Sequence, residues 1–200
     1  KELPKFPDSS KLRVKTKKQY VPYPKGRSLD QKSKEDVKTL INGTPIKRDL
    51  LIEYLHLIQD KYRCIKKSHL AALSDIMKIP FAEAFEVASF YAHFDVLDDN
   101  DPTPPEITIR MCDSLTCELK GSDSLLKDLQ KKYHNSDKVR VLRAPCMGLC
   151  DVAPACEVGH NHIKNCSMET IENAIKKKDT HPQIIDGISF DKYIKNGGYQ

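Results

Sequence analysis

Four of the seven cysteines fall in two close pairs whose spacing suits metal binding. Cys112 and Cys117 have four residues between them, and Cys146 and Cys150 have three. Paired cysteine thiolates bind either an iron–sulfur cluster or a structural zinc ion. Zinc ribbons favour pairs with only two intervening residues, so the longer loops suit a larger [2Fe–2S] cluster better. A zinc site and unligated thiols remain alternatives.

The elements expected around these pairs would bring them together. Residues 107–111 alternate between apolar and polar side chains, which predicts a half-buried strand that ends at the first pair. Residues 139–142 predict a second strand that ends shortly before the second pair. If these strands are parallel neighbours, both loops lie at one edge of the sheet. Gly148, inside the second pair, leaves room for backbone N–H groups near the sulfurs.

Further helices and strands are expected between and after these two strands. A helix is expected from Ser122 to Tyr133, between the two strands. Residues 155–158 and 162–163 predict a hairpin, and a last helix begins at Ser167. A right-handed strand–helix–strand unit followed by a hairpin and a helix is a thioredoxin-like layout. The Cys-x-x-Cys motif of disulfide exchange is absent, so that chemistry is not predicted.

A helical block precedes this domain. Apolar residues recur at helical spacing in three segments, 48–62, 68–77 and 80–91, with Ser68 as a possible cap of the second. We therefore expect an α/β fold class: an N-terminal three-helix bundle (46–97) followed by a thioredoxin-like domain with a small mixed sheet (98–180). The acidic, proline-rich segment 98–105 is a linker or long loop.

The N-terminal segment has a different composition. Residues 1–38 carry twelve Lys and Arg against five Asp and Glu, among several prolines. We expect residues 1–45 to form a basic extended arm. Nucleic-acid binding is one use of such an arm, but a solvated tail or a contact with a partner subunit is favoured, because no folded basic platform follows it.

The other cysteines and the histidines give weaker indications of metal binding. Three cysteines lack a partner at ligand spacing and are expected to be free thiols: Cys64, Cys156 and Cys166. The histidines of the helical block show no ligand-like clustering: His56, His69 and His93. His160 and His162 are two residues apart and are expected to share one face of a strand, as surface or subunit-contact residues.

Composition limits the class of protein. The 200 residues are 39% hydrophobic and 30% charged, which is typical of a globular chain. An odd number of cysteines argues against a fully paired disulfide framework. No signal pattern follows Lys1 and no apolar run is long enough to span a membrane, so we expect a cytoplasmic protein without membrane insertion. Since the first residue is not Met, we expect a processed chain or an excerpt.

Two segments carry a resemblance to a known family. Residues 113–121 (DSLTCELKG) and 144–154 (APCMGLCDVAP) resemble the thioredoxin-like [2Fe–2S] ferredoxin family, which includes the 24 kDa subunit of NADH:quinone oxidoreductase (complex I). Residues 86–91 are similar to the family's stretch at the end of its helical bundle, and the resemblance covers about residues 46–180. It implies a [2Fe–2S] cluster with four cofactor-binding and metal-ligating residues: Cys112, Cys117, Cys146 and Cys150.

Further segments resemble larger enzymes of this kind. Residues 57–62, 90–95 and 157–162 are similar to the N-terminal domain of the flavin-binding subunit of molybdenum-containing, NAD-dependent formate dehydrogenases. NAD-reducing hydrogenases have a similar arrangement. Residues 190–199 resemble the opening of the complex I 51 kDa flavin subunit, so 181–200 is expected to be a linker and the start of a flavin-binding domain.

The resemblance implies electron transfer within a multisubunit NAD-linked oxidoreductase, most like formate dehydrogenase, with complex I or NAD-reducing hydrogenase as the alternative. FMN, NAD and a [4Fe–4S] cluster are expected in an adjoining flavin domain, beyond Gln200. The expected partners are that domain and other iron–sulfur subunits, and no nucleic acid. No catalytic residue is predicted, and the segment alone is expected to lack turnover with NADH. A zinc-stabilised nucleic-acid-binding module and a structural docking domain are alternatives of other classes.

Overall fold

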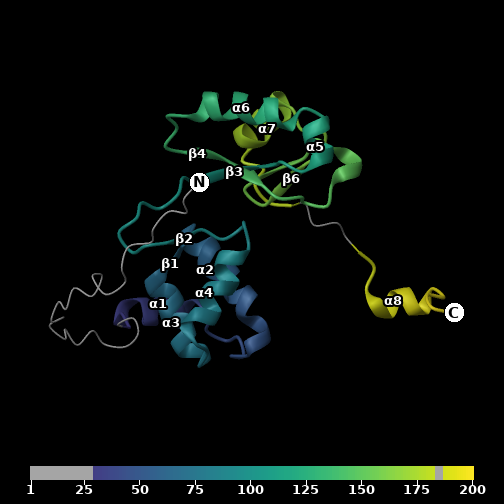
Figure 1. Cartoon of the computed structure of the whole chain (residues 1–200). Coiled ribbons are helices and arrows are strands. Elements are labelled where there is room, and N and C mark those ends of the chain that lie inside the picture. Colours follow the sequence, from purple (N-terminus) through teal and green to yellow (C-terminus); the bar gives the residue numbers. More distant parts are fainter. Residues whose placement is uncertain (1–28, 183–186) are drawn as a thin grey trace, which may run out of the picture.

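The computed structural model describes residues 29–182 and 187–200. Figure 1 shows a helical part, residues 29–97, beneath a sheet part, residues 98–182, with the short helix α8 (Phe190–Lys195) beyond them. Residues 1–28 of the predicted basic arm and residues 183–186 of the predicted linker lie outside the described residues. Within the described ranges, no helix is both long enough and apolar enough to cross a membrane.

The helical part contains one helix more than the sequence predicts. Its helices are α1 (Gln31–Leu40), α2 (Leu51–Tyr62), α3 (Lys67–Met77) and α4 (Phe81–Phe90), and the single turn η2 (Arg48–Leu50) leads into α2. The last three helices match the predicted bundle. Their core consists of fully buried side chains: Tyr54, Leu55, Ile58, Leu70 and Leu73.

Helix α1 corrects the prediction of an extended arm through residue 45 and of a bundle with three helices. Asp30 caps this helix, because its carboxylate accepts a hydrogen bond of 2.8 Å from the backbone N–H of Ser33. Val37 lies fully buried in the core of the bundle. Val37 is the only buried apolar residue within α1, which gives too weak an apolar period to predict a helix. The contact with α3 supplies the missing stabilisation.

The three serines expected at or near the starts of helices have different roles in the structure. Ser167 caps α7 (Met168–Lys177) through a reciprocal capping box with Thr170. Ser68 is not a cap, because α3 begins one residue earlier and the Ser68 N–H donates to Asp99 at 2.9 Å. Ser122 is the first residue of α6 (Ser122–Tyr133) and is buried; Gly121, with φ of +90°, takes the capping position.

A short parallel pair of strands closes the helical part. β1 (Ile65–Lys66) follows α2, and β2 (Val96–Leu97) follows α4. The N–H of Ile65 also donates to the carbonyl of Asp95 at 2.8 Å. These bonds hold the segment between α4 and β2, which includes His93, against the end of α2.

The sheet part has the expected order of elements. Its strands are β3 (Ile107–Cys112), β4 (Val139–Ala144), β5 (Cys156–Val158) and β6 (Asn161–Ile163), and its helices are α5 (Leu115–Leu119), α6 and α7, with one turn η3 (Cys150–Val152). The spatial order is β4-β3-β5-β6. β3 pairs with β4 in parallel and with β5 antiparallel, and β5 and β6 form the predicted hairpin. The predicted mixed α/β fold class, helices followed by a small thioredoxin-like sheet, is confirmed.

The two faces of the sheet differ in chemistry. Helices α6 and α7 cover one face, as Figure 1 shows, and the core beneath them includes Ile109, Met111 and Ile171. Because side chains alternate along a strand, Thr108 and Arg110 point to the opposite face. That face lies against the helical part, where an Arg110 NH2 group donates to the carbonyl of His93 at 2.9 Å.

Candidate functional site: two cysteine pairs at the edge of the sheet

The parallel pairing of β3 and β4 places both cysteine pairs at one edge of the sheet. Cys112 is the last residue of β3 and stands opposite Ala144, the last residue of β4. The chain leaves each strand at the same edge. Cys117 follows on α5, and Cys146 lies two residues beyond Ala144. Cys150 begins the turn η3.

The second pair is arranged around a glycine. The Sγ atoms of Cys146 and Cys150 are 3.6 Å apart. The N–H of Gly148 donates to Cys146 Sγ at 3.4 Å. Gly148 adopts φ of +77°, a conformation that residues with a Cβ rarely take, so the glycine allows the turn that aims this N–H at the sulfur.

The pairs differ in their exposure. Cys112 and Cys117 are each only 2% exposed, whereas Cys146 and Cys150 are exposed. The buried pair packs with Ala155 in a small apolar cluster, and partly buried side chains surround it: Met147, Leu149 and Ala153. The site therefore has a dry inner side and a side open to solvent.

The sulfurs influence one another's protonation. The Gly148 N–H lowers the pKa of the Cys146 thiol, and Cys146 in turn raises the pKa of Cys150. Burial raises the pKa of Cys117, and the neighbouring Cys112 adds to that effect. Cys112 also acts on the pKa values of Cys146 and Cys150, which places the four thiols within range of one another. Metal binding here would release protons.

The spacing of the sulfurs helps to separate a cluster from a single zinc ion. Four thiolates on one zinc, each about 2.3 Å from the metal, lie about 3.8 Å from one another. Among the described residues, no three cysteine sulfurs lie within 4.8 Å of one another. Two cysteine pairs, one on each of two neighbouring loops, fit a cluster in which each iron takes two protein sulfurs. The chemistry of this donor set suits a [2Fe–2S] cluster.

The other three cysteines are free thiols and are buried, as expected for Cys64, Cys156 and Cys166. The sequence gives no sign that Cys156 and Cys166 are neighbours. In the fold, Cys166 raises the pKa of Cys156 because the two side chains meet beneath the sheet. Cys166 Sγ also lies 3.9 Å from Met111 Sδ. These contacts belong to the core of the sheet part and not to the cysteine-pair site.

The histidine predictions are corrected. His160 lies in the turn between β5 and β6, so it does not share a strand face with His162, which is exposed on β6. The His160 ring instead approaches His93 of the helical part, with centroids 5.4 Å apart, and His93 lies 4.9 Å from His56. His56 and His93 therefore meet within the helical part, and the contact between the two parts adds His160 to them.

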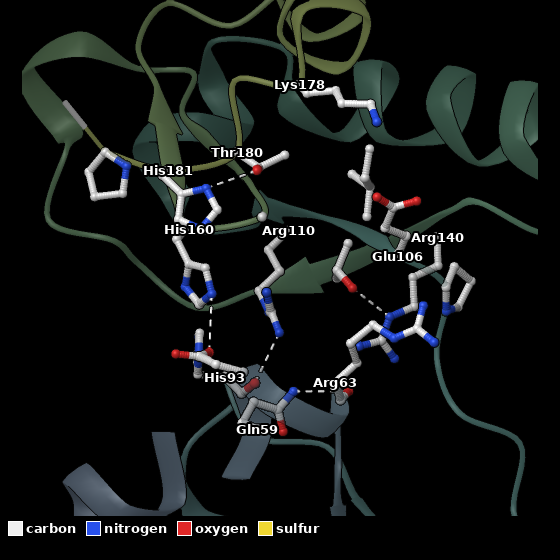
Figure 2. A pocket seen from close by; sticks show the side chains of 16 residues that line it. Gln59, Arg63, His93, Glu106, Arg110, Arg140, His160, Lys178, Thr180 and His181 are labelled. Atoms are coloured by element: carbon white, nitrogen blue, oxygen red, sulfur yellow. Dashed lines mark hydrogen bonds and ion pairs between the residues drawn. The ribbon is translucent and has the colours of Figure 1, made fainter. Parts of the chain in front are cut away.

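This cluster borders a cavity of about 620 Å³ between the two parts. Figure 2 shows His160, His93 and His181 on one side of the cavity, and Arg63, Arg140 and Glu106 on the other. Burial and the nearby charge of Arg110 lower the pKa of His93 from 6.5 to about 4. The lining residues come from segments far apart in the chain, so no local spacing could have identified them.

Comparison with solved structures supports the fold. Two crystal structures of an NAD+-reducing [NiFe]-hydrogenase, in the air-oxidised and H2-reduced states, match 65% and 72% of this chain. Their TM-scores are 0.50 and 0.51, at 23% and 22% sequence identity. The matched region is 23% of the hydrogenase chain in each structure, so the present chain spans about a quarter of that chain's length.

Comparison with curated proteins finds relatives of similar length. An NADH-quinone oxidoreductase subunit of Aquifex aeolicus (strain VF5) is 30% identical over 141 residues, which is 65% of this chain and 85% of that protein. The subunit of the same name in Rickettsia bellii (strain RML369-C) is 24% identical over 160 residues, or 75% of this chain and 93% of that protein.

The family comparison covers both parts of the fold. A model described as thioredoxin-like [2Fe-2S] ferredoxin matches residues 37–179, from the end of α1 to just beyond α7. The matched region includes both cysteine pairs and is well over half of the chain. The protein therefore belongs to the thioredoxin-like [2Fe-2S] ferredoxin family.

Proposed function

We propose that this chain is the [2Fe–2S] electron-transfer module of a multisubunit NAD-linked oxidoreductase. The observation that carries the proposal is the placement of two cysteine pairs, in a chain of this family, at one edge of the sheet. We assign the ligands to Cys112, Cys117, Cys146 and Cys150. Their arrangement as two pairs, with four and three residues between the cysteines, supports a two-iron cluster over one zinc ion.

A bound [2Fe–2S] cluster supplies one-electron redox chemistry. The protein supplies ligation and tuning. The Gly148 N–H donates to Cys146 Sγ and so stabilises negative charge on that sulfur. Such hydrogen bonds raise the reduction potential, because the reduced state is the more negative one.

The two sides of the site have different roles. On the inner side, Cys112, Cys117 and Ala155 are buried and exclude water. On the outer side, Cys146 and Cys150 are exposed, beside the helix α5, whose Leu115 and Leu119 are 71% and 78% exposed. Exposed leucines next to an electron-transfer site suit a protein partner that covers them. The partners we propose are a flavin- and NAD-binding domain and other iron–sulfur subunits.

The relatives bear on which type of complex this chain belongs to. The relatives described above are NADH-quinone oxidoreductase subunits and an NAD+-reducing hydrogenase, which favours the complex I or hydrogenase type. The formate dehydrogenase type rests on the resemblance of residues 57–62, 90–95 and 157–162 alone. In each type FMN, NAD and a [4Fe–4S] cluster belong to the flavin domain, so we expect this chain by itself to lack turnover with NADH.

The cluster assignment is tested on anaerobically purified protein by absorption and EPR spectroscopy with metal analysis. We expect two irons per chain, visible absorption bands and an EPR signal on reduction. Cys117→Ser should change or abolish these signals. Cys64→Ser is the matched control, because Cys64 is equally buried but lies in the helical part. A colourless, EPR-silent reduced protein with stoichiometric zinc would reject the proposal in favour of a zinc-stabilised module.

The parent complex is tested by isolating it through an affinity tag on this chain. The complex I type predicts NADH-dependent reduction of a quinone or dye by the isolated complex. The hydrogenase type predicts H2-dependent reduction of NAD, and the formate dehydrogenase type predicts formate-dependent reduction of NAD. A complex with none of these activities contradicts the proposal that the chain serves an NAD-linked oxidoreductase.

A further inference from the structure

Three ligand-bearing side chains meet where the helical part contacts the sheet part. Asp60 is near the end of α2, His93 follows α4, and His160 is in the turn between β5 and β6. One ligand atom from each lies within 4.8 Å of the other two. In the described residues, this is the only group of three or more His, Cys, Asp or Glu side chains with that geometry. Figure 2 shows His93 and His160 turned toward each other at the cavity wall.

The distance between two of these atoms suits a shared metal ion. His160 Nε2 lies 3.2 Å from Asp60 Oδ1. Two ligand atoms about 2.0 Å from one zinc ion, at a tetrahedral angle, lie about 3.3 Å apart. The same distance also suits a direct hydrogen bond, so this pair alone does not establish a site.

The third residue provides the independent observation. His93 Nε2 is buried and has no hydrogen-bond partner. A buried polar atom without a partner is costly, and such atoms in native proteins often belong to a site for an ion or water. Burial also favours the neutral imidazole, which is the form that binds metals.

We propose that Asp60, His93 and His160 bind one divalent transition-metal ion, with Zn²⁺ as the first candidate, at the junction of the two parts. Two imidazoles and one carboxylate are a common ligand set for Zn²⁺. The adjoining cavity is also lined by His181, the candidate for a further ligand. The His181 ring lies 5.9 Å from His160 between centroids, and Thr180 occupies its Nδ1, so Nε2 is the nitrogen left to bind.

The charges around the site are compatible with a cation. The charged group with the largest effect on His93 is Arg110, which donates to the carbonyl of His93. Its guanidinium is balanced by Glu157 at 3.5 Å and by Asp95 at 4.0 Å. The ion's charge is partly neutralised by the carboxylate of Asp60. A metal at this position ties α2 and the segment after α4 to the β5–β6 turn, so it stabilises the docking of the two parts.

The test measures zinc on the cluster-loaded protein, purified through a tag that contains no histidine and then dialysed against dilute Zn²⁺. Elemental analysis should give about one zinc per chain in addition to the iron. His160→Ala and Asp60→Asn should each weaken zinc binding by roughly 100-fold or more. Both side chains are substantially exposed, so these variants should still fold, which circular dichroism checks. His162→Ala is the matched control and should bind zinc like the unmodified protein.

X-ray absorption at the zinc edge distinguishes this site from the cysteine pairs. We expect nitrogen and oxygen ligands at about 2.0 Å and no sulfur at about 2.3 Å. A sulfur shell, no retained zinc, or equal zinc binding by His160→Ala would each overturn the inference. The result is separate from the proposed function, because loss of the iron–sulfur signals in Cys117→Ser leaves the histidine site intact.

Discussion

Arg140 on β4 and Asp95, just before β2, form a two-point ion pair that joins the sheet part to the helical part. Arg140 NH1 lies 3.0 Å from Asp95 Oδ1, and NH2 bonds the other carboxylate oxygen. Both side chains are largely buried, at 22% and 18% exposed. Asp95 also accepts a hydrogen bond of 3.2 Å from Gln59 on α2. One carboxylate thus connects α2, the end of the helical part and the sheet.

Replacing this carboxylate should destabilise the protein. Asp95→Ala leaves Arg140 with a buried, unpaired charge, and we expect the free energy of unfolding to fall by about 2–4 kcal/mol. Urea denaturation followed by circular dichroism measures the change. Asp123→Ala is the control, because it removes a more exposed ion pair with Arg143 and should have little effect. Equal stability losses in the two variants would contradict the role given to Asp95.

A methyl group at Gly148 should weaken retention of the cluster. Gly148→Ala strains a residue at φ of +77° by about 1–2 kcal/mol and disturbs the N–H directed at Cys146. Gly43 has a similar φ of +85° in the helical part, with open space around it. Gly43→Ala should therefore lower stability comparably without changing the iron content. Iron analysis after gel filtration makes the comparison, and equal iron loss in both variants would refute the local effect.

A buried histidine should make stability depend on pH. Burial lowers the pKa of His69 below its usual 6.5, so the unfolded state binds the proton more readily. The stability from neutral His69 is present above pH 6.5 and is lost as the pH falls from there toward the lowered pKa. Chemical denaturation between pH 7.5 and pH 5 should show a smaller loss of stability for His69→Asn. Asn135→Ala, at an exposed position without a titratable group, should keep the original slope.

The core beneath the sheet should be sensitive to loss of volume. Ile171 on α7 is fully buried against the sheet, so Ile171→Ala should lower the free energy of unfolding by about 2–5 kcal/mol. Leu119 on α5 is 78% exposed, and Leu119→Ala should change stability by less than about 0.5 kcal/mol. Thermal and urea unfolding measure both. A large loss for Leu119→Ala would mean that α5 packs more closely than its exposure indicates.

Much of the sheet part could be predicted from the sequence, because its signals are local. The alternation in residues 107–111 predicted β3, and the apolar period from Ser122 to Tyr133 predicted α6. Two strands joined by a helix pair in parallel, so the spacing of the four cysteines was enough to predict that both pairs meet at one edge. The assignment of these cysteines as cluster ligands stays a prediction.

The tertiary structure decided the features that depend on contacts between distant segments. Helix α1 forms because Val37 finds a buried position in the bundle, which its weak local period does not reveal. Asp60 and His93 are distant in the sequence and meet through packing within the helical part, and His160 joins them only where the sheet docks on the helices. Local sequence patterns determine secondary structure and the adjacent turns. The docking of the sheet part on the helical part depends instead on how the two folded surfaces fit together.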